Sequence, residues 1–342
     1  MRSVMVGHRF WRVLCLTVFV GGLVSLSACG AGAMRREARA ERRAERDGSA
    51  PQESAASATA AGLTRVELNV GGDNRYYLIY VPRSYKPGAP TPLVMVFHGG
   101  GANAEKMAGQ TGFSALAERE GFIVAFPNGS PMRLKGSASW NTESGQFKDR
   151  SEKSGVDDVG FVRAALSRIK RDYNIDSRRV YATGMSKGGM FAYTLACRMS
   201  DEIAAIAAFS ATMTIARCEP TQPVAILHVH GTADRTVPLD GGKGDLTAGG
   251  NNYPPVARGI DFWKSRDRCT AQEDVTKDGP ETTCYAYRSC VRDVKLCLIE
   301  GHGHGWPGKP AVKWQRQMKV NVSQTFDGTG EAWEYFETHP KP

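Results

Sequence analysis

The stretch YATGMSKGGMFAY, residues 181–193, decides the fold. Its centre, GMSKG at 184–188, fits the pattern G-x-S-x-G, in which a serine occupies a sharp turn between a strand and a helix. The pattern is short and glycine is abundant, with 38 Gly among 342 residues. These five letters alone therefore do not separate a catalytic serine from a glycine-rich turn, and the flanking sequence has to decide.

Both flanks of Ser186 have the required character. RRVYATG, residues 178–184, predicts a buried strand, and residues 188–198 predict an amphipathic helix. The two glycines permit the tight turn between these elements. The first turn of the helix offers free N–H groups and the positive end of the helix dipole to developing negative charge. We therefore interpret Ser186 as a nucleophile.

The rest of the chain alternates between strands and helices. Apolar runs predict strands near 65–70, 76–82, 92–98, 122–127, 203–210, 224–230, 283–289 and 294–299. Helices are expected near 113–119, 157–173, 260–268 and 331–339. SGVD at 154–157 resembles a capping box that opens the second of these helices. This order predicts an α/β fold with a mostly parallel central sheet, helices on both faces and a single catalytic domain, residues 63–342.

The N-terminus reads as an export signal. Residues 1–12 are basic, 13–26 are apolar, and LSAC at 26–29 resembles a bacterial lipobox. We expect a lipoprotein signal peptide over residues 1–28, lipidation of Cys29 and anchoring to the cell envelope, with an ordinary signal peptide as the alternative. Residues 29–62 are low in large apolar side chains and predict a tether.

Export also accounts for the cysteines. Six remain beyond the leader and the lipobox, an even number that suggests disulfides in an oxidising compartment. Proximity along the chain favours the pairs Cys197–Cys218, Cys269–Cys284 and Cys290–Cys297.

An acid and a histidine follow Ser186 in the order that a serine triad on such a sheet requires. Asp234 follows the strand at 224–230, and we prefer it to Asp240, which lies further into the same loop. GHGHGWPG at 301–308 follows the last strand and offers His302 and His304 as the base.

Two backbone N–H groups are expected to bind the oxyanion. One belongs to Lys187, the residue after the nucleophile, and the other to the glycine loop at 99–101. We prefer Gly100 as the second donor, with Gly99 as the alternative. His98 is expected to shape this loop.

Several segments together give a family resemblance from about residue 63 to the C-terminus. HGGGAN, FPNG, SGVDDVGFVRAAL, YNIDSRRVYATGMSKGGMFAYTLAC, HVHGTAD and GHGHGWPG resemble the secreted polyhydroxybutyrate depolymerase and feruloyl esterase family of α/β-hydrolases. The resemblance implies the α/β-hydrolase fold and serine-ester chemistry with no metal or cofactor. It also selects His304 over His302, because the family's histidine precedes x-Trp-Pro-Gly, and it implies the pair Cys197–Cys218.

The chain departs from the family at Lys187, where a smaller residue is usual. Its side chain is expected to be solvated, or to favour acidic acyl groups. Trp140 and Trp306 are candidate platforms for an aromatic acyl group or a polymer chain, with plain packing as the alternative.

The sequence thus predicts an exported serine esterase acting on feruloyl or acetyl esters of polysaccharide, or on short polyhydroxyalkanoate-type esters. Its expected partners are the ester and, through the lipid, a membrane; the oligomeric state stays open. The net charge is +9, and beyond residue 62 the positive charge is spread without a Lys/Arg block, so no nucleic-acid partner is expected. Two alternatives remain: a metal-dependent hydrolase built on His228, His230, His302 and His304, and a catalytically inactive surface binding protein.

Overall fold

The computed structural model describes residues 57–58, 62–246, 251–270, 273–277 and 279–342. The expected signal peptide at 1–28, the lipidation site Cys29 and most of the tether at 29–62 lie outside the described residues. Among the described residues, no helix combines the length and the apolar character needed to cross a membrane.

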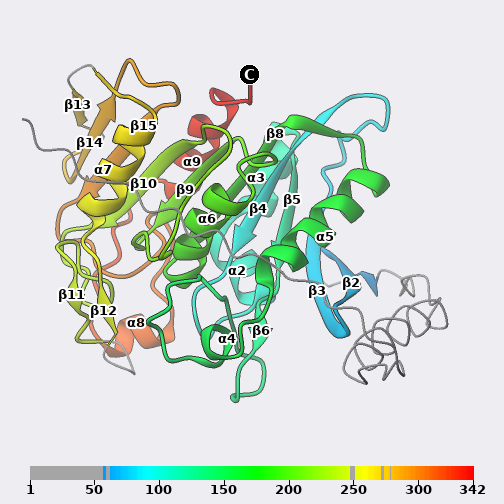
Figure 1. Cartoon of the computed structure of the whole chain (residues 1–342), viewed down its shortest axis with the longest axis horizontal. Coiled ribbons are helices and arrows are strands. Elements are labelled where there is room, and N and C mark those ends of the chain that lie inside the picture. The colour runs from blue at the N-terminus through cyan, green and yellow to red at the C-terminus, as the bar shows by residue number, and fades with distance from the viewer. Residues whose placement is uncertain (1–56, 59–61, 247–250, 271–272, 278) are drawn as a thin grey trace, which may run out of the picture. The chain divides into compact units, whose positions relative to one another are not determined.

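An 11-stranded sheet forms the centre of the fold, in the order β1-β2-β3-β5-β4-β8-β9-β10-β15-β14-β13 (Figure 1). The strands from β5 to β15 in this order run parallel, and antiparallel strands flank them on both edges. This confirms the predicted α/β architecture with a mostly parallel sheet. The strands are β1 Ser57–Ala58, β2 Thr64–Val70, β3 Asp73–Tyr80, β4 Thr91–Phe97, β5 Ile123–Pro127, β8 Ile175–Met185, β9 Ala205–Phe209, β10 Ala225–Gly231, β13 Glu273–Lys277, β14 Thr282–Tyr287 and β15 Val294–Ile299.

Helices cover both faces of this sheet. The apolar cluster on one face includes side chains of α5, α6 and α7, and the cluster on the other face includes side chains of α2, α3 and α9. Burying a large apolar side chain contributes roughly 1.5–3 kcal/mol, so these two layers hold the strands in place. The helices are α2 Ala104–Thr111, α3 Phe113–Glu120, α5 Asp158–Asp172, α6 Lys187–Arg198, α7 Val256–Arg266 and α9 Gly328–Glu337.

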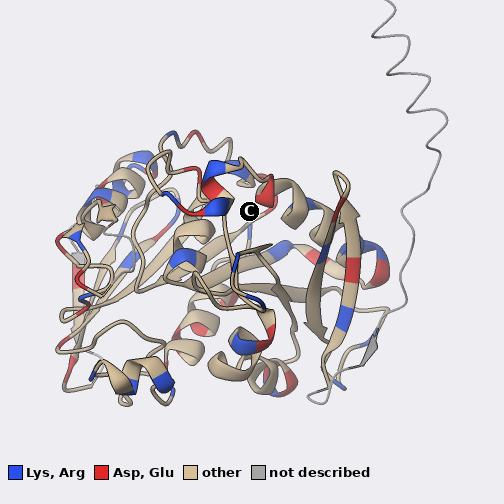
Figure 2. Ribbon diagram, turned by 90° about the horizontal axis from the view of Figure 1, so that it is seen from below, with Lys and Arg blue, Asp and Glu red and all other residues tan. Residues whose placement is uncertain are grey.

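Short elements lie outside these layers. The helices α4 Arg150–Lys153 and α8 Lys313–Gln317, and the paired strands β6 Ser130–Pro131 with β7 Ala138–Ser139 and β11 Gly242–Lys243 with β12 Asn252–Tyr253, were not predicted from the sequence. In Figure 1, α4, α8 and β6 gather along the lower edge. Figure 2 shows Lys and Arg interspersed with Asp and Glu along the described chain.

The start of α5 differs from the prediction. Asp157 caps this helix and accepts a hydrogen bond from Gly160 N–H at 2.7 Å, whereas Ser154 ends the preceding helix α4. The expected capping box at 154–157 is therefore wrong. Asp157 suffices because one short carboxylate satisfies a free N–H group of the first turn.

One of the three predicted disulfide pairs is confirmed, and the other two are wrong. Cys197–Cys218 forms as expected, but the other bonds are Cys269–Cys290 and Cys284–Cys297, and the pairs Cys269–Cys284 and Cys290–Cys297 are wrong. Cys284 and Cys297 lie directly opposite each other on the antiparallel strands β14 and β15. Cross-strand register, and not distance along the chain, decides this pairing.

Candidate active site

Ser186 lies at the turn between β8 and α6. Its backbone has φ 56° and ψ −126°, outside the regions that L-residues prefer, which costs roughly 1–3 kcal/mol and marks a constrained position. A Cβ atom on Gly184 would lie 2.6 Å from the Phe97 carbonyl oxygen, and one on Gly188 would lie 2.6 Å from that of His98. Both glycines are therefore required for β4 to approach this turn closely.

Asp234 and His304 meet at the same edge of the sheet. The Nδ1 of His304 donates a hydrogen bond to Oδ2 of Asp234 at 2.8 Å. The other carboxylate oxygen, Oδ1, accepts from the N–H groups of Thr236 and Val237 at 2.8 and 2.9 Å. These contacts fix the orientation of the carboxylate, and the bond at Nδ1 leaves Nε2 of His304 as the nitrogen that can take a proton.

The pKa of Asp234 lies below its ordinary value. Burial alone would raise this pKa, but the nearby His304 imidazole, His230 and the backbone N–H of Val237 outweigh the burial. The carboxylate therefore stays ionised and can stabilise an imidazolium. Asp234, and not the rival Asp240, makes this contact with His304.

The glycine loop after β4 packs against the turn at Ser186. A Cβ atom added to Gly99 would lie 3.4 Å from Cβ of Ser186, and one added to Gly100 would lie 3.7 Å from Cβ of Lys187. His98 holds the loop in place, since its Nδ1 donates to Gly99 O at 2.8 Å and its Nε2 accepts from Gly129 N–H at 2.9 Å. Burial lowers the pKa of His98 to about 4, so this ring is neutral.

A cavity of about 480 Å³ opens over this centre. Ser186, Lys187 and His304 line it together with Gly99 and Gly100. The structure thus brings the predicted nucleophile, base and oxyanion donors to one site, with Asp234 behind His304. Its other lining residues are Ala102, Met107, Gln110, Met132, Ser139, Phe147, Asp149, Met185, Met190, Thr236, Leu246, Asn251, Tyr253, Val312, Trp314 and Gln315.

The two tryptophans singled out from the sequence are core residues. Trp140 is fully buried, stacks on Phe191 with ring centroids 4.7 Å apart, and donates to His98 O at 2.9 Å. Trp306 is also buried, and its Nε1 donates to Thr329 Oγ1 at 2.9 Å. Neither belongs to the cavity lining, so their interpretation as substrate platforms is wrong and both serve packing.

Other aromatic residues line the cavity instead, and the sequence reasoning missed them. Phe147 and Tyr253 meet edge to face, with ring centroids 5.7 Å apart. Trp314 of α8 is 38% exposed, and its ring centroid lies 6.2 Å from that of His304. Gln315 fixes α8 beside the base, because its Nε2 donates to His304 O at 2.7 Å. No local motif precedes any of these aromatic residues.

The side chain of Lys187 is buried and paired, which corrects both expectations for it. Its Nζ forms an ion pair with Asp149, lies 3.9 Å from Oε1 of Glu152, and sits over the ring of Phe147 at 5.0 Å. One ammonium thus faces two carboxylates. The side chain is not solvated, and it adds no surplus positive charge that would attract an acidic acyl group.

The other histidines proposed as metal ligands use their ring nitrogens within the fold. His228 bonds to Tyr193 OH at 2.8 Å and to His230 at 3.2 Å, and His230 bonds to Val237 O at 2.9 Å. His302 accepts from Ser323 N–H at 2.9 Å, and burial lowers its pKa to about 4. A metal ion here would have to displace these bonds, so the geometry favours the serine site.

Comparisons with known proteins agree with this geometry. The sequence model of the family described as "Esterase PHB depolymerase" matches residues 76–240. Over these residues the chain is similar to that esterase family. Its relatives include a bifunctional acetylxylan esterase/xylanase from Neocallimastix patriciarum, 28% identical over 68% of this chain and 31% of that protein. A putative esterase from Nocardia uniformis subsp. tsuyamanensis is 29% identical over 78% of this chain and 81% of that protein.

A third relative, feruloyl esterase B from Piromyces equi, is 29% identical over 67% of this chain and 42% of that protein. The chain thus spans less than half the length of two of these relatives. Among solved structures, an acetyl xylan esterase from Aspergillus awamori matches with a TM-score of 0.51 and 15% identity, over 75% of this chain and 97% of that one. That likeness shows the α/β-hydrolase fold.

Proposed function

We propose that the protein is an exported serine esterase that hydrolyses carboxylic esters through Ser186, His304 and Asp234. One observation carries the proposal: the Asp234–His304 hydrogen bond of 2.8 Å lies beside a cavity that His304 shares with Ser186 at its constrained turn. The order serine, acid, histidine along the chain is that of α/β-hydrolases. The similarity of residues 76–240 to an esterase family supports the same chemistry.

The reaction proceeds in two halves. His304 takes the proton of Ser186 as the serine oxygen attacks the ester carbonyl, and Asp234 stabilises the imidazolium. The N–H groups of Lys187 and Gly100 bind the oxyanion, each worth about 3–4 kcal/mol, with Gly99 as the alternative donor. His304 then protonates the departing alcohol. A water molecule, deprotonated by His304, attacks the acyl-enzyme carbonyl; the bond to the Ser186 oxygen breaks, His304 returns the proton to that oxygen, and the acid is released.

The relatives named acetylxylan esterase and feruloyl esterase support acyl groups such as acetate and ferulate on polysaccharide. Short polyhydroxyalkanoate-type esters are the other candidate substrates, in keeping with the description of the matching family. The cavity of about 480 Å³, lined by apolar, aromatic and polar residues, has the volume and mixed lining typical of a small-molecule site.

We also propose that the catalytic domain, residues 63–342, is exported and held at the cell envelope. A signal peptide over 1–28, a lipid on Cys29 and a tether over 29–62 would provide the anchor. The three disulfides support folding in an oxidising compartment.

The test compares residues 63–342, with their disulfides intact, and the Ser186→Ala variant on p-nitrophenyl acetate, p-nitrophenyl butyrate, methyl ferulate and a hydroxybutyrate oligomer. We expect hydrolysis of at least one ester by the parent, and a loss of about 10³-fold or more in kcat for the variant. A folded parent that is inactive on all four esters, or a variant that keeps full activity, would contradict the proposal.

A further inference from the structure

Residues 141–156 form a compact loop beside the cavity, which we call the 141–156 loop. Its two ends are joined, because Nδ2 of Asn141 donates to Val156 O at 2.9 Å. Glu152 ties its interior together by accepting from Thr142 N–H and Oγ1 at 2.8 and 2.6 Å, and from Ser144 N–H and Oγ at 3.2 Å. The loop therefore holds its own shape, as closed surface loops of this length do.

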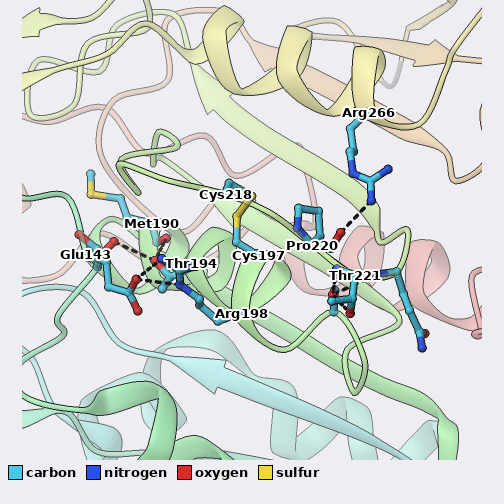
Figure 3. Close-up of a disulfide and its surroundings, with 12 residues drawn as sticks. Glu143, Met190, Thr194, Cys197, Arg198, Cys218, Pro220, Thr221 and Arg266 are labelled. Atoms are coloured by element: carbon cyan, nitrogen blue, oxygen red, sulfur yellow. Dashed lines mark hydrogen bonds and ion pairs between the residues drawn. A yellow bond between two sulfur atoms is a disulfide. The ribbon is translucent and has the colours of Figure 1, made fainter. Parts of the chain in front are cut away.

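The base of this loop is fastened to α6 away from the cavity. Thr194 Oγ1 donates to Thr142 O at 3.0 Å. Arg198 Nε donates to Glu143 Oε2 at 2.8 Å, and Figure 3 shows this pair next to the disulfide Cys197–Cys218. These contacts fix residues 142–143, several residues away from the tip that reaches the cavity.

The tip of the loop consists of Phe147, Lys148 and Asp149. Phe147 and Asp149 line the cavity, and both contact the Lys187 side chain. The side chains of Lys187 and Asp149 are only 11% and 22% exposed, so solvent screens this ion pair weakly. Lys187 is also the first residue of α6 and directly follows the nucleophile.

We propose that Lys187 is a positioning residue whose side chain holds the tip of the 141–156 loop against α6 and so fixes the wall that faces the acyl group. This inference rests on the proposed function. His304 protonates the alcohol as it departs, and Trp314 lies beside His304, so the alcohol is on the α8 side. The tip of the 141–156 loop is held by Lys187, the residue next to Ser186. We therefore assign the wall that this tip forms to the acyl group.

This assignment gives Lys187 two separate tasks. Its backbone N–H is a proposed oxyanion donor, and its side chain sets the position of Phe147 and Asp149. We expect a short acyl group such as acetyl to stop short of the loop tip, and the longer butyryl and feruloyl groups to reach it. Loss of the Lys187–Asp149 ion pair should therefore weaken the binding of large acyl groups and leave the chemical step on acetate esters unchanged.

The decisive variant is Asp149→Asn, which keeps the shape of the side chain and its acceptor oxygen for the N–H groups of Ser151 and Glu152. We expect KM for p-nitrophenyl butyrate and methyl ferulate to rise about five- to tenfold, as for the loss of a half-buried ion pair, and kcat on p-nitrophenyl acetate to stay within about twofold. Asp149→Glu should restore much of the parent KM. The control is Lys148→Met, which removes an exposed charge from the same tip.

Lys187→Met tests the other partner. A double-mutant cycle combines Asp149→Asn with Lys187→Met. The double variant should raise KM no further than the worse single variant, because each change removes the same Lys187–Asp149 contact. Additive effects of the two changes would overturn the inference. An equal fall in kcat on all three esters in Asp149→Asn would also overturn it, because that result points to the oxyanion site and not to the wall.

A second readout does not depend on ester hydrolysis. Arg150 and Lys153 lie just after the tip, and both are exposed. Release of the tip should speed tryptic cleavage after Arg150 and Lys153 in Asp149→Asn but not in Lys148→Met. An unchanged rate of cleavage at these two sites in Asp149→Asn would contradict the attachment of the loop tip to Lys187. If the parent hydrolyses no ester, the proposed function fails, while this cleavage rate still tests the attachment of the loop.

Discussion

The catalytic centre and the walls of the cavity originate in different ways. Ser186, Asp234 and His304 each follow the end of a parallel strand, β8, β10 and β15, and the sheet brings these ends together. The walls come from the 141–156 loop and α8, which are held by side-chain contacts such as Lys187–Asp149 and Gln315–His304 O. Sheet geometry therefore places the proposed triad, and separate side-chain contacts shape the walls of the cavity beside it.

The largest effect is expected at the centre, from Asp234→Asn. An asparagine no longer stabilises the imidazolium or holds the required tautomer of His304, and kcat should fall by about 10⁴-fold. The measurement is steady-state hydrolysis of p-nitrophenyl acetate by both proteins. The matched control is Asp240→Asn, which changes an exposed residue of the same loop and should leave kcat unchanged. Equal losses in the two variants would remove the distinction between these carboxylates.

A second prediction concerns the pH dependence of the free energy of unfolding, through two buried histidines near the centre. Burial lowers the pKa values of His98 and His302 to about 4, whereas an unfolded histidine titrates near 6.5. The unfolded chain therefore binds more protons below pH 6.5, and stability is lost as the pH falls toward 4. Between pH 7 and pH 5 the free energy of unfolding should drop by about 2 kcal/mol for each histidine.

Urea unfolding followed by tryptophan fluorescence at pH 7 and pH 5 measures this loss. The variant His302→Gln should show a smaller drop between the two pH values than the parent, because one titrating group is gone. A parent whose unfolding free energy is the same at both pH values would contradict the account of these buried neutral rings.

The smallest effect is expected on the α8 wall, from Trp314→Ala. This change removes a partly exposed indole beside His304, and should lower kcat/KM for p-nitrophenyl butyrate by about tenfold through lost ring contact. Ethyl butyrate, which has the same acyl group and a small alcohol, should be affected much less. Met318→Ala is the control, since Met318 ends the same helix, is 51% exposed and lies outside the cavity lining. Equal losses on both esters would contradict the assignment of this wall to the alcohol.

The same division separates the residues that the sequence indicates from those that it does not. The proximity of Ser186, Asp234 and the histidine pair at 302 and 304 was predictable because each lies in a glycine-containing segment after an apolar strand, whereas the choice of His304 over His302 came from the family resemblance. Trp140 and Trp306 looked equally promising because they adjoin such segments, yet a position next to a motif does not determine which way a side chain points. Both point into the core, whereas Trp314 reaches the cavity from a short helix that carries no motif.

The cysteines show the same limit. Cys284 and Cys297 pair because β14 and β15 align antiparallel with these residues opposite each other. Cys269 and Cys290 then pair with each other. Distance along the chain carries no information about strand register, so the two adjacent pairs predicted from the sequence were wrong.

The most direct test of the central claim is covalent labelling of the nucleophile. The parent, the Ser186→Ala variant and the Asp234→Asn variant are treated with a fluorophosphonate, and the modified peptide is located by mass spectrometry. We predict one adduct per parent molecule on Ser186, loss of ester hydrolysis in proportion to labelling, much slower labelling of Asp234→Asn, and no adduct on Ser186→Ala. An adduct on another residue, or hydrolysis that persists in the fully labelled parent, would contradict the account.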